Sequence, residues 1–419
     1  MRIPHLSNAR VIRFSTFPAG VAIFVAPFWA SAGLRGAMLL LAGAAILFAH
    51  LRSGQLKQLL PPEKMLGVAV VIWLVAVSIW SLLGPSPMES LSVVKRDILT
   101  TVLAFLVFYS LTRTRVDLMR WIAILTAGLV ILTGTVILDS NDPRAFGPAR
   151  EYVDVGWLST WLVTVAPLFA VLMFPPRPQR GSATILLTIG LSCLLSSAWL
   201  SGNRMVWICF AAIVVVSAAI VSRGRKSERD RMRSYFVVAG LLVVIGLMMA
   251  ASMQFRADAE APGGAGSVAM LVQDSRAHIW RVAWEMIRER PLLGYGYSNP
   301  DLPVVFAAHF DPGWRHLYWH AHNVVLNYLL QMGITGAVVL LFLFAALART
   351  FVARARLGAL ARLGGYCGIA LVIAVMLRNS TDDFFSRHAI QFFGAFAGML
   401  LGIAIRRPPL AEGAARKRR

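Results

Sequence analysis

Charged residues, and acidic ones above all, are scarce in this sequence. Only 15% of the 419 residues are charged, and the 20 Asp and Glu are outnumbered by 41 Lys and Arg. A soluble domain has about 25% charged and roughly 45–50% apolar residues, whereas 58% of this chain is hydrophobic. The composition excludes a soluble globular enzyme, a disordered protein and a fibrous repeat, and it indicates a polytopic membrane protein.

Cysteine is also rare, and the sequence contains too little of it for a disulfide framework. The three residues, Cys193, Cys209 and Cys367, all fall inside apolar runs, where a thiol behaves as a small hydrophobic side chain. We therefore expect them to fill the core, and they predict neither disulfides nor a cysteine metal cluster.

Long apolar runs make up most of the chain. A membrane-spanning helix needs about 20 mostly apolar residues, and runs of this kind predict about twelve transmembrane helices in an all-α fold. The candidates are residues 15–33, 36–50, 66–84, 98–112, 118–138, 156–174, 183–200, 204–222, 235–253, 324–348, 363–378 and 389–405. No connection is long enough for a folded soluble domain, so we expect a single integral membrane domain over residues 1–419.

The basic residues predict the orientation of these helices. With the N-terminus in the cytoplasm, about two thirds of the 41 Lys and Arg fall in cytoplasmic connections, as the positive-inside rule requires. Both termini are then cytoplasmic, and a large periplasmic loop, 254–322, joins the ninth and tenth helices. In a soluble protein the net charge of +21 would favour nucleic-acid binding. Here it lies between apolar segments, so we expect a lipid bilayer as partner and no nucleic acid.

The first apolar run allows a second interpretation. It follows Arg2, Arg10 and Arg13 and ends at Ala30-Ser31-Ala32, a pattern similar to a signal peptide with its cleavage site. A second apolar run follows immediately, and we therefore expect an uncleaved first helix.

The periplasmic loop contains an amphipathic helix. Five apolar residues recur at helical spacing: Ile279, Val282, Ala283, Met286 and Ile287. Four charged residues take the opposite side: Arg281, Glu285, Arg288 and Glu289. Asp274 or Ser275 can cap the start, and Pro291 with the glycines that follow ends the helix.

Two arginines stand where a cation is not expected. Arg276 and Arg204 each lie in the first turn of a predicted helix at the periplasmic side, where the helix macrodipole disfavours positive charge. A bound anion would remove that penalty. The alternatives are a snorkelling side chain for Arg276 and an ion pair with Asp154 for Arg204.

Polar residues gather before the tenth apolar run. His316 and His320 are four residues apart and could share a helix face, which raises the possibility of a metal site. No third ligand follows at a recognisable spacing, so we predict no metal. His322 is followed by Asn323 at the mouth of a membrane helix, where polar groups tend to be functional. The turn between the last two helices adds the candidates Asp382, Asp383 and Arg387. Its carboxylates could orient a histidine or pair with the arginines, and the alternative is that they are ordinary loop residues.

These residues resemble a known family. His322-Asn323 followed by Gly333 and Gly336 is similar to the His-Asn…Gly-x-x-Gly signature of the bacterial O-antigen ligases, which belong to a wider ligase/polymerase family of membrane glycosyltransferases. The stretch from Asp274 to Gly296 resembles the segment that precedes this signature. Ser201 to Arg204 is similar to the start of a family helix that usually reads Ser-Arg, and here Asn203 replaces the serine.

The resemblance implies an enzyme of the Gram-negative inner membrane with a periplasmic active site. Such enzymes transfer O-antigen polysaccharide from undecaprenyl diphosphate to the outer-core sugar of lipid A-core, and they use neither a metal nor a nucleotide sugar. By the resemblance, Arg204 and Arg276 bind the diphosphate and His322 is the catalytic base. His320, Asn323, Asp382, Asp383 and Arg387 are supporting candidates, and no cofactor is expected.

The chemistry of a lipid diphosphate donor agrees with these roles. Two guanidinium groups can neutralise the charge that develops on the leaving diphosphate, and histidine suits the removal of a hydroxyl proton near neutral pH. Three alternatives stay open. An O-antigen polymerase or a protein O-oligosaccharyltransferase would use the same donor, and a transporter of lipid-linked glycans would show internal repeats or paired helix breaks.

Overall fold

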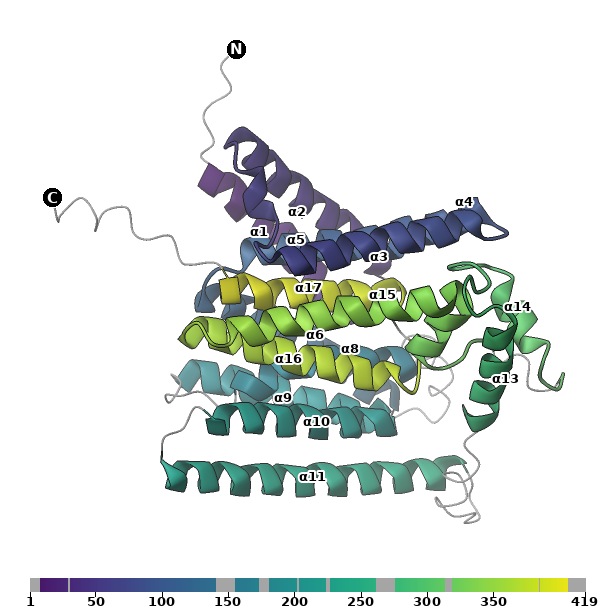
Figure 1. Ribbon diagram of the computed structural model, residues 1–419. Coiled ribbons are helices and arrows are strands. Elements are labelled where there is room, and N and C mark those ends of the chain that lie inside the picture. The colour runs from purple at the N-terminus through teal and green to yellow at the C-terminus, as the bar shows by residue number, and fades with distance from the viewer. Residues whose placement is uncertain are drawn as a thin grey trace.

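The structure is a computed structural model that describes residues 8–28, 31–140, 155–172, 181–201, 203–223, 227–260, 276–312, 319–383 and 385–405. Every regular element in these ranges is a helix. Most of the long helices run roughly parallel in one bundle, with α1 and α2 inclined to the rest (Figure 1).

The helices follow the predicted order. Those before the loop are α1 (Asn8–Phe24), α2 (Ala32–Arg52), α3 (Lys64–Leu83), α4 (Pro87–Val93), α5 (Thr100–Leu111), α6 (Arg115–Ser140), α8 (Val155–Leu172), α9 (Gly181–Ser201), α10 (Arg204–Arg223) and α11 (Glu228–Glu260). The rest are α13 (Arg276–Glu289), α14 (Leu302–Ala307), α15 (Val324–Arg354), α16 (Ala359–Asn379) and α17 (Arg387–Ile405). A 3-10 turn, Leu56–Leu59, follows α2, and a π-helical turn, η3 (Val94–Leu99), joins α4 to α5.

Eight of these helices are long and apolar enough to cross a membrane. Three shorter apolar stretches, Phe14–Phe24, Gly156–Phe169 and Arg204–Ala219, lie in α1, α8 and α10. The chain is therefore a multi-pass membrane protein, and the count of twelve spans stays a prediction. Several boundaries differ from the predicted ones. The helix α1 spans Asn8–Phe24 rather than 15–33, α11 continues to Glu260, inside the predicted loop, and helical structure begins at Pro87, well before the apolar run at 98–112.

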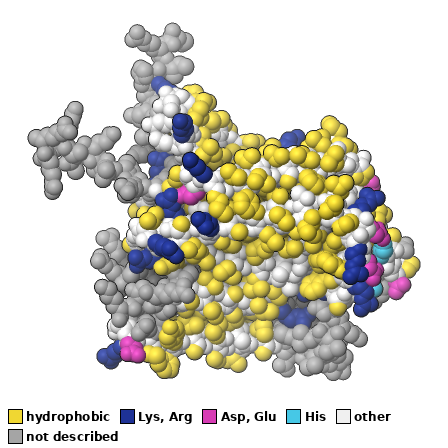
Figure 2. Space-filling model, viewed as in Figure 1, with side chains coloured by type: hydrophobic (Ala, Val, Ile, Leu, Met, Phe, Trp, Pro, Cys, Tyr) yellow, Lys and Arg dark blue, Asp and Glu magenta, His cyan; other side chains and the backbone are white. Residues whose placement is uncertain are grey.

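The surface of the bundle has the polarity that a bilayer requires. Large apolar side chains such as Leu40, Val71 and Phe236 are exposed, and hydrophobic atoms cover the middle of the visible face (Figure 2). Charged side chains gather at the two ends of the bundle (Figure 2). Monomeric soluble proteins rarely expose apolar patches above a few hundred Å², so this face fits lipid rather than water.

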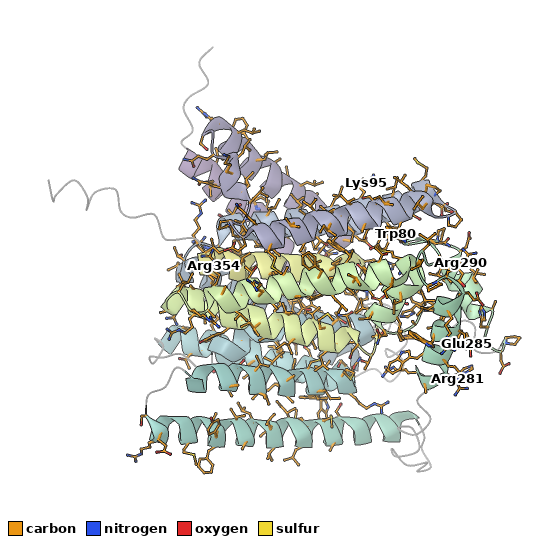
Figure 3. All side chains as sticks on the ribbon, viewed as in Figure 1. Trp80, Lys95, Arg281, Glu285, Arg290 and Arg354 are labelled. Carbon is orange, nitrogen blue, oxygen red and sulfur yellow. The ribbon has the colours of Figure 1, made fainter. Side chains whose placement is uncertain are left out.

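One end of the bundle carries α13, α14 and the 380–386 turn, and we call it the loop end (Figure 1). The predicted amphipathic helix is confirmed there as α13: its five apolar residues are buried, and its four charged residues are exposed. Arg281 and Glu285 point away from the bundle (Figure 3). The predicted caps, Asp274 and Ser275, lie outside the described residues.

A kink in α15 fixes the segment that follows α13. Gly333 has φ +62°, and a Cβ atom there would collide with the backbone of Leu292. Opposite the kink, the backbone N–H of Tyr295 donates to the carbonyl of Leu330 at 2.8 Å, and that of Ile334 donates to Pro291 at 2.8 Å. Gly333, the first glycine of the His-Asn…Gly-x-x-Gly pattern, is thus required because the loop segment packs directly against the kinked helix.

Close packing of α17 against α5 positions the last turn of the loop end. A Cβ atom on Gly394 would lie 2.7 Å from the carbonyl oxygen of Thr101. Gly398 and Gly402, at four-residue spacing, approach the backbone of α5 in the same way. A stripe of small residues lets two membrane helices approach closely, and it brings the start of α17 beside η3.

Candidate active site

The backbone around His322 is shaped by Asn323, which caps α15. Its Oδ1 accepts the backbone N–H groups of Val325 and Leu326 at 2.9 and 3.1 Å, and its Nδ2 donates to the carbonyl of Ser380 at 2.8 Å. One side chain therefore joins the start of α15 to the turn after α16. His322 itself has φ +47°, a left-handed conformation that is uncommon for a residue with a Cβ and often found at functional sites.

Asp382 is the hydrogen-bond partner of His322. Nδ1 of His322 lies 3.0 Å from Asp382 Oδ1, and Nε2 of His320 lies 3.6 Å from the same oxygen. The other carboxylate oxygen, Oδ2, is 3.4 Å from Nη2 of Arg378. Burial raises the pKa of Asp382, but the hydrogen bonds to His320 and His322 and the charge of Arg378 outweigh it and hold the pKa well below its usual range. Asp382 is therefore ionised at neutral pH.

Asp383, the next residue, has the opposite environment. Its carboxylate accepts from Nδ2 of Asn327, whose Oδ1 in turn accepts the backbone N–H of Ala321 at 2.9 Å. Burial raises the pKa of Asp383 above its ordinary value, against the opposing effects of His320 and Asn327. Of the two candidate aspartates, Asp382 faces the histidine and Asp383 holds the backbone beside it.

Arg378 connects this histidine–aspartate pair to the start of α10. Its side chain is 1% exposed, and Nη2 donates to Ser159 Oγ at 2.9 Å. The same hydroxyl oxygen accepts from Nδ2 of Asn203 at 3.2 Å, and Oδ1 of Asn203 caps α10 by accepting the N–H of Met205 at 2.9 Å. Asn203, which departs from the usual Ser-Arg pattern, is thus the N-cap of α10 and directly precedes Arg204, the first residue of that helix.

The two predicted arginines both start helices at this end. Arg276 is half-buried at the first position of α13, and its charge interacts with that of Arg378. Arg204 is half-buried and makes no ion pair within the described part of the chain. Its alternative partner, Asp154, lies outside the described residues. Cations on α10, α13 and α16 therefore lie at the same end of the bundle.

The supporting candidates divide into two groups. His320, Asn323, Asp382 and Asp383 lie around His322, as their hydrogen bonds and ion pairs show. Arg387 is placed elsewhere: its backbone N–H donates to Asp97 Oδ2 at 3.0 Å, and its side chain is exposed. The sequence grouped Arg387 with the aspartates because they share one short turn, but the backbone N–H of Arg387 bonds to Asp97 of η3 instead of to the His322 site.

One group of described residues could hold a metal ion. The nitrogen and oxygen ligand atoms of His320, His322 and Asp382 all lie within 4.8 Å of one another. This differs from the pair weighed in the sequence, since His316 lies outside the described residues. The same atoms already form the His322–Asp382 hydrogen bond, and the ring centroids of His320 and His322 lie 3.8 Å apart with the rings tilted by 40°. Hydrogen bonding and metal ligation would therefore compete for one carboxylate oxygen.

A cavity of about 490 Å³ opens elsewhere at the loop end. It lies between the end of α3 and the segment after α13, and its lining includes Trp80, Tyr295, Glu289 and Arg290. Trp80 and Arg290 both lie at this end (Figure 3). Nε1 of Trp80 donates to the carbonyl of Leu293 at 2.8 Å. Aromatic rings beside charged groups suit a polar ligand with an apolar face.

Sequence reasoning missed three residues of the site: Arg378, Ser159 and Asn327. A usable signal existed for Arg378, because a charged residue at the end of an apolar run is costly unless it is functional or paired. Ser159 and Asn327 carry no such signal, since polar side chains of this size occur throughout the helices.

Together these features define a multi-pass membrane protein with a cationic, histidine-containing site at one end of its helix bundle. Residues 189–341 match a family model described as O-Antigen ligase (Wzy_C). The matched segment includes Arg204, Arg276 and His322, whereas Arg378 and Asp382 lie beyond it. This family comprises ligases and polymerases that transfer glycans from lipid-linked donors. No curated protein matches the chain.

Proposed function

We propose that this protein is an O-antigen ligase. It transfers O-antigen polysaccharide from undecaprenyl diphosphate to the outer-core sugar of lipid A-core, at the periplasmic face of the Gram-negative inner membrane. Both termini are then cytoplasmic, and the loop end is periplasmic. The observation that carries the proposal is the hydrogen bond of 3.0 Å between His322 and an ionised Asp382, within a site to which helix-starting arginines contribute.

His322 acts as the general base. The N–H at Nδ1 of His322 donates a hydrogen bond to the ionised carboxylate of Asp382. This tautomer leaves the lone pair on Nε2 free to take a proton. The acceptor hydroxyl loses its proton to Nε2 as its oxygen bonds to the anomeric carbon of the glycan. The bond between that carbon and the phosphate oxygen breaks at the same time, and undecaprenyl diphosphate leaves. Attack opposite the leaving group inverts the anomeric configuration.

Arg204 and Arg276 stabilise the departing diphosphate. A guanidinium group forms two parallel, charge-assisted hydrogen bonds with phosphate oxygens, and its planar geometry makes it more selective than lysine. Because both residues begin helices, the free N–H groups of the first turn add to the anion site. Arg378 is a positioning residue, because it contacts Asp382 and the α8–α10 network rather than the reacting atoms.

The decisive experiment is transfer by purified protein. Undecaprenyl-diphosphate glycan and lipid A-core are supplied without nucleotide sugar, and the product is detected by its mass and by a shift on a gel. We expect glycosylated lipid A-core and free undecaprenyl diphosphate. Elongation of the lipid-linked glycan would instead identify a polymerase, and transfer only to a protein would identify an oligosaccharyltransferase. Movement of the donor across vesicles without any new glycosidic bond would identify a transporter.

A further inference from the structure

A second group of cations lies at the loop end, away from His322. It consists of Arg35 in α2, Arg96 in η3, and Arg387 and His388 at the start of α17; we call it the α2–α17 cluster. The charges of the three arginines all act on His388, that of Arg35 most strongly. These residues are remote in sequence and are assembled by the packing of α17 against α5.

Arg35 is the buried member of the cluster. The residue is 2% exposed, and its Nε and Nη2 atoms have no hydrogen-bond partner among the described residues. The guanidinium carbon lies 5.1 Å from the centroid of the Phe392 ring, a cation–π contact that stabilises the charge only in part. A buried cation whose N–H groups are unsatisfied is strongly unfavourable, and a bound anion would supply the missing acceptors.

The cluster keeps a surplus of positive charge after its carboxylate is counted. Oδ1 of Asp97 lies 2.7 Å from Nε of Arg96, and Oδ2 of Asp97 accepts a hydrogen bond from the backbone N–H of Arg387. One carboxylate offsets one guanidinium, and the charges of Arg35 and Arg387 are not offset by it. Together they match a doubly charged anion.

Two arginines of the cluster are exposed at the surface of the bundle. The side chain of Arg96 is 58% exposed, and that of Arg387 is also exposed. The ring of His388 lies 5.2 Å from that of Trp157, which fixes the imidazole at the edge of the cluster. One buried cation beside two exposed cations can form charge-assisted hydrogen bonds with the anionic end of a larger molecule.

We infer that the α2–α17 cluster binds a phosphate monoester of the glycolipid acceptor. This inference rests on the proposed function, which assigns the donor diphosphate to Arg204 and Arg276. A phosphate monoester carries about −1.5 to −2 charges at neutral pH, which equals the surplus of the cluster. Asp382 and Arg387 are five residues apart in the chain, so their Cα atoms lie at most about 18 Å apart. An acceptor held at the cluster can therefore present a sugar hydroxyl towards His322.

Binding is tested first without catalysis, on the full-length protein in lipid nanodiscs. The ligands are bisphosphorylated lipid A, the same lipid after phosphatase treatment, phosphatidylglycerol and inorganic phosphate. The variants are Arg387→Gln, which is exposed, and Arg35→Gln, which is buried. Lys95→Gln is the matched control, because it removes an exposed positive charge next to Arg96 that does not act on His388. Thermal unfolding checks that each variant is folded.

We expect Arg387→Gln to weaken binding of bisphosphorylated lipid A about tenfold, because charged hydrogen bonds to one guanidinium are lost. Lys95→Gln should stay within about twofold of the native protein, and Arg35→Gln, if folded, should weaken binding at least as much as Arg387→Gln. Dephosphorylated lipid A should bind equally to all variants. The inference is wrong if Arg387→Gln binds bisphosphorylated lipid A normally. It is also wrong if phosphatidylglycerol or free phosphate shows the same dependence on Arg387, since the cluster would then be a general headgroup or phosphate site.

Transfer kinetics separate this inference from the proposed function. Arg387→Gln should raise KM for lipid A-core about tenfold and leave KM for the lipid-linked donor unchanged. If the native protein transfers glycan and Arg387→Gln has a normal KM for the acceptor, the inferred phosphate site is wrong and the proposed ligase function stands. If the native protein transfers nothing but binds bisphosphorylated lipid A through Arg387, the ligase function fails and the phosphate site stands.

Discussion

The two polar clusters of the loop end differ in how their charges are balanced. Around His322, the carboxylate has partners of defined geometry: Asp382 faces His322, His320 and Arg378. In the α2–α17 cluster, two nitrogens of Arg35 have no hydrogen-bond acceptor among the described residues, and Asp97 offsets only part of the positive charge. The first arrangement orients a base, and the second provides charge for a ligand that brings its own acceptors.

This contrast distinguishes a site for chemistry from a site for binding. A general base must be held in one tautomer and one orientation, which requires fixed hydrogen bonds in the absence of substrate. An anion site gains more from cations that are not already paired, because forming new hydrogen bonds then breaks no existing ion pair. Variants of the residues around His322 test this contrast.

Replacement of His322 by alanine should have the largest effect. Loss of a positioned general base lowers the rate by about 10²- to 10⁴-fold, so transfer from lipid-linked glycan should fall close to background. His309→Ala is the control, because His309 is exposed and bonds to the carbonyl of Val305 at 2.9 Å. Normal transfer by a folded His322→Ala protein would leave the site without a base and remove the distinction between the two clusters.

Asp382→Asn should lower kcat by up to about 10⁴-fold, because an amide can donate to Nδ1 and favour the wrong tautomer of His322. Asp383→Asn is its neighbouring comparison and should lower kcat less, since Asp383 contacts Asn327 and the pKa of its carboxyl is already raised by burial. Equal kcat values for the two variants would show that neither carboxylate is specifically coupled to the histidine.

The lowered pKa of Asp382 also predicts how the stability of the protein depends on pH. Its pKa in the folded protein lies below that of an unfolded aspartate, which is about 3.9, so the ionised group stabilises the native state above that pH. The stabilisation should be lost as the pH falls below about 4, through the folded pKa. The difference in unfolding temperature between native and Asp382→Asn protein should therefore not shrink from pH 7 to 5 and should shrink below pH 4. A difference that shrinks between pH 7 and 5 would contradict the lowered pKa.

Arg276→Lys should reduce kcat/KM by roughly tenfold or more, since a point charge cannot reproduce the guanidinium fork on a diphosphate. Arg281→Lys is the matched control on the same helix, where the side chain is exposed and points away from the bundle (Figure 3). An active Arg276→Lys enzyme with an unchanged KM for the donor would show that the cations near His322 do not clamp the diphosphate.

Chelation should have the smallest effect. If His320, His322 and Asp382 work through their hydrogen bonds, transfer by purified protein should be unchanged after treatment with EDTA. Loss of activity that Zn²⁺ or another divalent cation restores would assign these three residues to a metal site, and His322 would then be a ligand rather than a base. Metal analysis of the purified protein gives an independent measure.

Local patterns in the sequence were sufficient for several elements. The apolar spacing predicted α13 and the face that it buries, because helical periodicity depends only on neighbouring residues. The position of Asn323 before an apolar run predicted a polar group at the mouth of a helix, and the structure gives it the role of N-cap. Lipid-facing helices were predicted in the same way, although length and composition support eight of the twelve expected spans.

By itself, the sequence determined that the chain folds as apolar helices with polar residues at their ends, because helix formation and burial in lipid depend on composition over about 20 residues. Only the tertiary structure decided that Asp382 rather than Asp383 faces His322, that Arg378 links them to α10, and that Arg387 joins Arg35 instead. The directions of side chains in one short turn are fixed by the packing of α15, α16, α17 and η3, which are far apart in the sequence.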